Sequence, residues 1–340
     1  MTIYIGTYTG QGSEGIYRAD FDPRSGAIDN VTLATTRANP SFLSLRGSRL
    51  AAVCEAGWRE GQTGSVALFN IAADGSLEPN SEVSSDGRGP CHLTLLDDAV
   101  WVANYGNGVV ARLPIVDGKL READFVDAHD GTGPHPTRQE QAHAHCAVAE
   151  PTGRFIVSAD LGNDTLYVYS VAERRRVARL STAPGAGPRL VAFSEDARQM
   201  FLVHELTGEI ARYDFDPDTG VPSHRQTVSI VPPNVVGEPS GAHVALHPSG
   251  RFVYASERAS DTIVTLALCS DGTLEWAATT AARGKTPRFF AISPDGRWMI
   301  VAHQSSGSLQ VFAADATGGA LLAVGKPVTL ASATCVAFAR

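Results

Sequence analysis

Short apolar stretches alternate with polar turns along almost the whole chain, and the same series of elements recurs roughly every 44 to 54 residues. The clearest unit has an apolar strand at Cys146–Ala149, a Pro-x-Gly turn, a second apolar strand at Phe155–Ala159, an acidic loop at Asp160–Asp164 and an alternating strand at Thr165–Tyr169. Alternation with a period of two is the pattern of a half-buried strand. Turns with glycine supply the positive φ values of tight hairpins. A period of this length, filled by strands, is typical of β-propeller blades.

The repeat predicts a closed ring of seven blades. Besides the clearest unit, inner strands are expected to begin at these positions: Pro90, Pro188, Gly241 and Pro287, with a weaker match at Pro40. The chain ends carry complementary fragments, because Thr2–Asp20 lacks a first strand and Thr334–Ala339 is a first strand alone. Joining the two fragments completes a blade and leaves few open sheet edges. We therefore predict an all-β fold, a seven-bladed β-propeller of four-stranded antiparallel blades, closed by the C-terminal strand and occupying residues 1–340 as a single domain.

Composition narrows the classes of partner. A net charge of −8 argues against nucleic acid and against an anionic membrane, both of which favour a basic face. No signal peptide, transit peptide or long apolar run is present, so a cytosolic protein is expected. The five cysteines are odd in number and three fall in predicted inner strands, so neither a disulfide nor a zinc site is expected.

Two segments interrupt the repeat. Trp58–Thr63 is expected to be a polar loop between strands, and Asp127–Gln141 is the longest insertion between blades. Ligand-binding loops tend to grow where the scaffold constrains the chain least. The insertion ends in a polar run that includes Arg138, and His143 and His145 follow it.

Strand order within a blade determines which side chains can meet. The loop that enters the first strand and the loop between the second and third strands lie on the same face, around one solvent-filled channel mouth. The entering positions include these residues: His145, Arg189 and Arg288, with Cys91, Ala242 and Thr334 elsewhere around the ring. The loops after the second strands supply these: Asn104, Asp160, Glu205 and Arg258, with Glu55 and Gln304 in equivalent places. Such a mouth is the default ligand site.

The same residues also allow a purely structural interpretation. Arginines and carboxylates can pair and tie blades together, His247 before a proline resembles a structural hydrogen bonder, and His92 and His243 can simply pack in the first strands. We favour a functional cluster, because a base, a carboxylate and two cations at one mouth stabilise a ring poorly when buried. Arginine also suits a bidentate grip on a carboxylate or phosphate.

Several motifs, in this order and spacing, resemble those of the seven-bladed propeller lactonases over nearly the whole chain. The motifs are Arg138-Gln139-x-x-Ala-His143-x-His145, Ser158-Ala-Asp160-Leu-Gly162-x-Asp164, Gly187-Pro188-Arg189, His204-Glu205-Leu206 and Ser256-Glu-Arg258. That family includes bacterial 6-phosphogluconolactonases and a fungal 3-carboxy-cis,cis-muconate lactonizing enzyme. In the fungal enzyme a histidine, two arginines and a glutamate are the proposed active-site residues, and they match His145, Arg189, Arg258 and Glu205 here.

The resemblance implies hydrolysis of a sugar lactone without a metal or other cofactor, and a small anionic lactone or sugar acid as the ligand. His145 or Glu205 would be the base, and Arg189 would lie near the oxyanion. Arg258, with Arg288 or Arg138, would hold the anionic end of the substrate. His143, Asp160 and Asn104 complete the predicted substrate-binding set.

Three alternatives remain open at this point. The same residues could perform reversible lactonization of a muconate-type dicarboxylate, and a non-enzymatic propeller could serve as a docking platform. Propeller lactonases of another type hold calcium with Glu, Asn and Asp, which Glu55, Asn104 and Asp160 could imitate. Two or more arginines at the same mouth would oppose a divalent cation, so we expect no metal.

Overall fold

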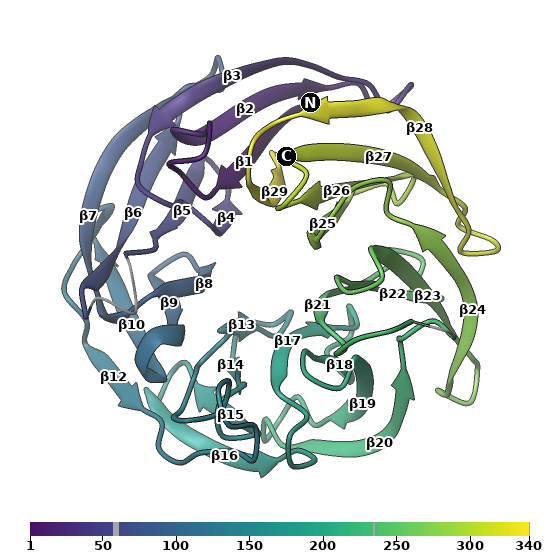
Figure 1. Cartoon of the computed structure of the whole chain (residues 1–340). Helices are drawn as coiled ribbons and strands as arrows, with labels where there is room; N and C mark the ends of the chain where they lie inside the picture. The colour runs from purple at the N-terminus through teal and green to yellow at the C-terminus, as the bar shows by residue number, and fades with distance from the viewer. Residues whose placement is uncertain (57–60, 234, 340) are drawn as a thin grey trace.

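The computed structural model describes residues 1–56, 61–233 and 235–339. Over these residues the chain forms seven antiparallel sheets arranged around a central axis, as Figure 1 shows. The predicted seven-bladed propeller is confirmed. Of the loop expected at Trp58–Thr63, residues 58–60 lie outside the described part of the chain, and Thr63 is already the first residue of a strand. No helix in the described ranges is long and apolar enough to cross a membrane.

The blades are numbered along the chain, and their strands are given from the axis outward. Blade 1 contains β29 (Ala333–Phe338), β1 (Thr2–Thr7), β2 (Gly15–Phe21) and β3 (Ile28–Thr36). Blade 2 contains β4 (Leu43–Arg46), β5 (Arg49–Cys54), β6 (Thr63–Ile71) and β7 (Leu77–Arg88). Blade 3 contains β8 (Pro90–Leu95), β9 (Ala99–Asn104), β10 (Val109–Val116) and, both paired with β10, β11 (Lys119–Leu120) and β12 (Phe125–Ala128). The 3-10 helix η2 (Tyr105–Asn107) follows β9.

The remaining four blades follow the same order. Blade 4 contains β13 (Val148–Ala149), β14 (Phe155–Asp160), β15 (Thr165–Ser170) and β16 (Arg175–Ser181). Blade 5 contains β17 (Pro188–Phe193), β18 (Gln199–His204), β19 (Glu209–Phe215) and β20 (Pro222–Ser229). Blade 6 contains β21 (Gly241–Leu246), β22 (Phe252–Glu257), β23 (Thr262–Leu268) and β24 (Leu274–Ala281). Blade 7 contains β25 (Pro287–Ile292), β26 (Trp298–His303), β27 (Ser308–Ala314) and β28 (Leu321–Thr329).

The two ends of the chain close the ring. The C-terminal strand β29 pairs antiparallel with β1, from Ile3 opposite Phe338 to Gly6 opposite Cys335. The predicted closure is therefore confirmed, and the inner edge of blade 1 depends on a strand from the opposite end of the chain.

Apolar side chains pack between neighbouring blades. Between blades 7 and 1, Ile3 and Ile5 contact the cluster that contains Ile300 and Trp298. The turn that ends at Gly26 passes directly over the indole ring, because a Cβ at this position would lie 2.6 Å from Trp298. Gly26 also has a φ of 76°, so both the close approach and the left-handed backbone require glycine.

One inner strand is shorter than predicted. The sequence indicates a strand at Cys146–Ala149, whereas β13 contains only Val148 and Ala149. The backbone N–H of Ala159 donates to the sulfur of Cys146, at 3.3 Å, so the ladder is interrupted there. An isolated bridge between Ala144 and Asp160 resumes the pairing nearer the channel mouth.

Candidate active site

An irregularity recurs at the start of the inner strands. In β17 the pairing with β18 passes from Pro188 to Leu190, and Arg189 has no partner residue on β18. The corresponding shifts leave out Cys91 in β8 and Arg288 in β25. An extra residue in a bulge is free of the ladder and re-aims its side chain. These three residues, which the sequence predicted at the channel mouth, owe their orientation to this repeated bulge.

A second ring of positions follows the second strand of each blade. In all seven cases the backbone N–H of that residue donates to a carbonyl oxygen of the segment that enters the inner strand, at 2.7 to 3.0 Å. The pairs are Tyr8 to Ser332, Glu55 to Asn39, Tyr105 to Gly89, Leu161 to His143, Glu205 to Gly187, Arg258 to Ser240 and Gln304 to Thr286. This shared hydrogen bond places their side chains at equivalent points around the axis.

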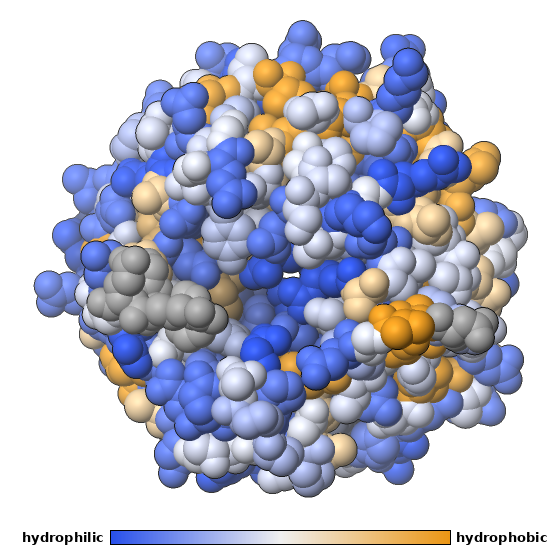
Figure 2. Space-filling model, viewed as in Figure 1, coloured by the Kyte–Doolittle hydropathy of each residue, from blue (hydrophilic) through white to orange (hydrophobic). Residues whose placement is uncertain are grey.

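The two rings enclose a cavity of about 330 Å³ at the channel mouth. In Figure 2 hydrophilic residues gather around the central opening. The charged residues that line the cavity are Glu55, Glu140, Glu205, Arg138, Arg258 and Arg288. The other titratable residues of the lining are His143, His145, Tyr8, Cys91 and Tyr105. The volume is at the small end of the range for small-molecule sites.

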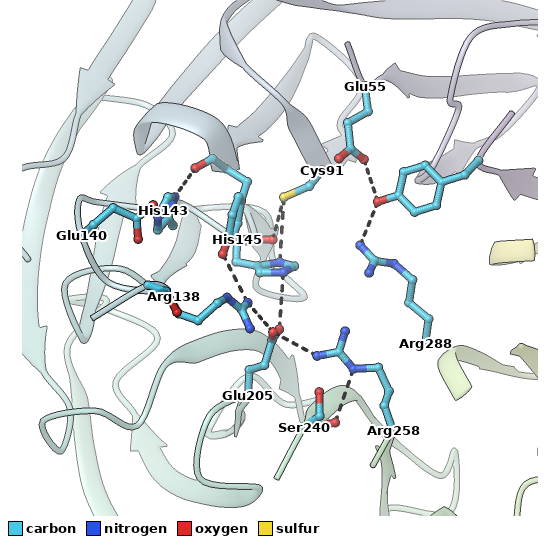
Figure 3. A pocket seen from close by; sticks show the side chains of 13 residues that line it. Glu55, Cys91, Arg138, Glu140, His143, His145, Glu205, Ser240, Arg258 and Arg288 are labelled. Carbon is cyan, nitrogen blue, oxygen red and sulfur yellow. Dashed lines mark hydrogen bonds and ion pairs between the residues drawn. The ribbon is translucent and has the colours of Figure 1, made fainter. Parts of the chain in front are cut away.

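Glu205 is the centre of the charge cluster, as Figure 3 shows. Its Oε1 accepts hydrogen bonds from Arg138 Nη2 at 2.5 Å and lies 3.0 Å from Arg258 Nη2, while its Oε2 accepts from Arg189 Nε at 2.8 Å. Burial by itself would raise the pKa of Glu205, but Arg258, Arg189 and Arg138 hold this pKa well below its ordinary value. Glu205 is therefore ionised throughout the neutral range and is a weak proton acceptor.

Arg189 supports this cluster from below the cavity. It does not line the 330 Å³ cavity but a smaller hollow of about 20 Å³ farther along the channel, together with His92 and His243. Besides Glu205, its guanidinium donates to the carbonyl oxygen of Ala242. Burial lowers the pKa of Arg189 to about 10, against the opposing effect of Glu205. The arginine still carries its charge at neutral pH.

Two of the side chains expected to face a solvent-filled mouth are covered: Glu205 lines the cavity with little exposed surface, and Arg189 does not line it. Glu205 is 3% exposed and Arg189 is 5% exposed. Neighbouring guanidinium groups cover the glutamate, and the glutamate covers the arginine. Removing Glu205 would leave the charge of Arg189 buried without a carboxylate partner, whereas removing Arg189 would leave Glu205 with Arg138 and Arg258.

His145 lies beside Glu205 and is also buried. Its Nε2 is 3.8 Å from Glu205 Oε2, and its Nδ1 is 3.8 Å from Cys91 Sγ. Burial lowers the pKa of His145 well below its usual value, Arg189 and Arg288 add to this effect, and Glu205 opposes it. The imidazole is therefore neutral at neutral pH and able to accept a proton.

The opposite side of the cavity carries a second group, formed by Arg288, Tyr8 and Glu55 from blades 7, 1 and 2. Arg288 Nη2 donates to the hydroxyl oxygen of Tyr8 at 3.2 Å, and the Tyr8 hydroxyl donates to Glu55 Oε2 at 3.0 Å. The Arg288 guanidinium carbon lies 5.4 Å from the Tyr8 ring centre. Among the described residues Arg288 has no carboxylate within ion-pair distance, so its charge is available to an anionic ligand.

Two predicted substrate-binding residues lie outside the cavity. Asn104 and Asp160 are fully buried, and neither lines it. Asn104 Nδ2 donates to the carbonyl oxygens of Ser85 and Val109. Asp160 is the last residue of its strand, so it corresponds to His204 rather than to Glu205. A shift of one residue along a strand reverses the direction of the side chain, which is why these two residues point away from the mouth.

Asp160 nevertheless positions the polar run that enters blade 4. Its Oδ1 accepts hydrogen bonds from the backbone N–H groups of His143, at 2.7 Å, and Gly162, at 3.0 Å. A Cβ at Gly162 would lie only 1.8 Å from the carbonyl oxygen of Gln141, so glycine lets the insertion pass close to this loop.

His143 and Arg138 both lie on the cavity wall, as predicted. His143 Nδ1 is 2.7 Å from the carbonyl oxygen of Tyr105, and its ring stacks on the Tyr105 ring. Arg138 reaches across from the insertion to Tyr105 and Glu205. The insertion therefore contributes directly to the candidate site.

Five lining residues were not predicted as part of the site: Tyr8, Tyr105, Thr137, Glu140 and Ser240. The repeat carried a signal for two of them, because Tyr8 and Tyr105 occupy the ring position that Glu205 occupies in blade 5. Glu140 belongs to the insertion and follows no repeat. Ser240 immediately precedes an inner strand.

Within the described part of the chain, no group of three or more His, Cys, Asp or Glu side chains is arranged to hold a metal ion. The calcium-like set considered above is not assembled: Glu55 lines the cavity, while Asn104 and Asp160 are buried at the ends of β9 and β14. All five cysteines are unpaired.

Comparison with known proteins agrees with this architecture. The family described as "Lactonase, 7-bladed beta-propeller" matches residues 2–338. A Bacillus subtilis protein named 6-phosphogluconolactonase is 32% identical, with the alignment covering 98% of this chain and 97% of that protein. The structure of a periplasmic gluconolactonase from Pseudomonas aeruginosa has a TM-score of 0.93 at 31% identity, covering 100% of this chain and 99% of the other. A putative 6-phosphogluconolactonase from Bacteroides fragilis has a TM-score of 0.91 at 27% identity, covering 100% and 98%.

Proposed function

The chain belongs to the seven-bladed β-propeller lactonase family, and on that premise we propose that it hydrolyses a sugar lactone, 6-phosphogluconolactone or a related aldonolactone, without a metal ion. The observation that supports this most strongly is the neutral His145 beside the ionised Glu205 on the wall of a small cavity rich in arginine. The names of the relatives support a lactonase-like hydrolase.

His145 is the base in this mechanism. The tautomer with the proton on Nδ1, facing Cys91 Sγ, leaves the Nε2 lone pair directed toward Glu205. A water molecule between Nε2 and Glu205 Oε2 can donate a hydrogen bond to each, and His145 takes its proton as the water attacks the lactone carbonyl. The negative charge of Glu205 then stabilises the imidazolium. Glu205 is a positioning residue, since three cations keep its own pKa low.

The cations lining the cavity have distinct tasks. Arg258 adjoins Glu205 and faces the cavity, so it stabilises the oxyanion that forms at the carbonyl. This role passes to Arg258 because Arg189 lies below the cavity wall. Arg288, which has no carboxylate partner among the described residues, holds an anionic substituent of the substrate, and Arg138 covers the site from the insertion.

The test is a proton-release assay at weakly buffered, slightly acidic pH, with phosphorylated and unphosphorylated aldonolactones. We expect hydrolysis above the spontaneous rate that chelator leaves unchanged and that His145→Asn reduces at least a hundredfold. If the protein hydrolyses none of these lactones but consumes 3-carboxy-cis,cis-muconate, it is a cycloisomerase instead.

Location is a separate prediction. The sequence favours a cytosolic protein, while the Pseudomonas aeruginosa relative is named periplasmic. Fractionation of the native organism, with activity followed in each compartment, distinguishes the two.

A further inference from the structure

The cavity holds two carboxylates in opposite electrostatic environments. Glu205 accompanies His145 and Arg258 on blades 4 to 6, and Glu55 accompanies Tyr8 on blades 1 and 2. Figure 3 shows the two groups on opposite sides of the space between them. Three guanidinium groups surround Glu205, whereas no cation lies within ion-pair distance of Glu55 among the described residues.

The burial of Glu55 favours a carboxyl group that keeps its proton, although its two hydrogen bonds favour the carboxylate. Ser41 Oγ, at 2.6 Å, and the Tyr8 hydroxyl, at 3.0 Å, both donate to Oε2. Oε1 accepts no hydrogen bond from the described part of the chain, and the residue lines the cavity. Burial raises the pKa of Glu55, and the lowering effects of Ser41, Arg288 and Tyr8 do not cancel it. The charged and titratable groups that face Glu55 are Tyr8, Arg288 and Cys91.

Lactone hydrolysis needs an acid as well as a base. The leaving group is the ring oxygen, and an alkoxide is too basic to leave unassisted at neutral pH. The base that activates water lies on one side of the cavity, so an acid is needed where the ring oxygen lies. Two titratable groups whose surroundings separate their pKa values are the usual arrangement of such pairs.

We propose that Glu55 is the catalytic acid, with its Oε1 proton directed at the ring oxygen of the lactone; this rests on the proposed lactonase function. Water adds its oxygen to the carbonyl carbon and gives one proton to His145 Nε2. The bond between the carbonyl carbon and the ring oxygen then breaks, and the ring oxygen takes the proton of Glu55. The product is a hydroxy acid, Glu55 is left as a carboxylate and His145 as an imidazolium. Proton transfer from His145 to Glu55 through the cavity water restores the enzyme.

The first experiment compares the variant Glu55→Gln on two substrates of the same shape. Glutamine can still accept the hydrogen bonds of Ser41 and Tyr8 but has no acidic proton. With the oxygen lactone we expect kcat to fall about a hundredfold or more. With the analogue that has sulfur in the ring, the leaving thiolate needs no proton and kcat should fall less than about fivefold. An equal loss on both substrates, or no loss on either, overturns the proposal.

The control is Glu82→Gln, the same substitution on β7 at the outer edge of the same blade, where the side chain pairs with Arg37. It should leave the rates on both substrates unchanged, and both variants should melt as one cooperative transition. If the unaltered protein hydrolyses no lactone, the proposed function fails. If it does and Glu55→Gln keeps its rate, only the acid assignment fails.

A second measurement uses Ser41→Ala, which removes a hydrogen bond that favours the ionised form of Glu55. The pKa of Glu55 should rise further, and the alkaline limb of kcat/KM should move to higher pH. An alkaline limb at the same pH in this variant shows that another group sets it and overturns the assignment.

Discussion

Replacing Glu205 by glutamine should destabilise the fold as well as reduce activity. The carboxylate compensates Arg189, Arg258 and Arg138, whose side chains are 7%, 14% and 38% exposed. The partly exposed Arg138 regains water, so most of the loss comes from Arg189. Breaking a buried ion pair by removing one partner costs about 3–5 kcal/mol. With about 2.1 cal/mol/K of unfolding entropy per residue, this lowers Tm of a chain of 340 residues by about 4–7 °C.

The pH dependence of this effect has a definite sign. The pKa of Glu205 is lower in the folded protein than in the unfolded chain. Its stabilising contribution is therefore fully present above the unfolded pKa of about 4.3 and is lost as pH falls through the folded value. Differential scanning calorimetry from pH 7 to pH 4 compares Tm of the unaltered protein with Tm of Glu205→Gln. The difference between the two Tm values should stay constant down to about pH 5.

The double variant Glu205→Gln, Arg189→Met separates stability from activity. Replacing both members of a buried pair is often neutral or stabilising, so Tm should recover most of the loss. Turnover should stay about a hundredfold or more below the unaltered enzyme, since the base loses the charge that stabilises it. A surface substitution changes Tm by on the order of 1–2 °C or less. If Tm of Glu205→Gln at pH 7 lies within about 1–2 °C of that of the unaltered protein, this reasoning is refuted.

Three further results are expected. Deleting residues 333–340 removes β29 and exposes the edge of β1, so Tm should fall by far more than terminal trimming normally causes; a fall of only a degree or two by calorimetry contradicts the closure argument. Because burial and Arg189 lower the pKa of His145, the acid limb of kcat/KM should lie well below pH 6.5, and a limb at the ordinary histidine value would exclude His145 as the base. Arg288→Ala should raise KM about tenfold or more for a phosphorylated lactone and little for its unphosphorylated counterpart, and equal effects in steady-state assays would remove its proposed role.

The sequence by itself determined the fold and the set of loops that converge. The strand period gave the blades, and the complementary fragments at the two ends predicted the pairing of β29 with β1. Antiparallel order within a blade then fixes which loops share a face, so His145, Arg258 and Arg288 could be placed at one mouth. Each of these properties follows from the repeat pattern, because every unit has the same strand order and the two end fragments together complete one unit.

Only the tertiary structure decided the register and the environment of each side chain. A difference of one residue separates Asn104, which is buried at the end of β9, from Tyr105, which lines the cavity. Burial raises the pKa of both carboxyl groups; it stays raised at Glu55, whereas the guanidinium groups of Arg258, Arg189 and Arg138 bring that of Glu205 well below its ordinary value. Desolvation and Coulomb interactions act through space, so residues distant in the sequence set them and no repeat pattern records them.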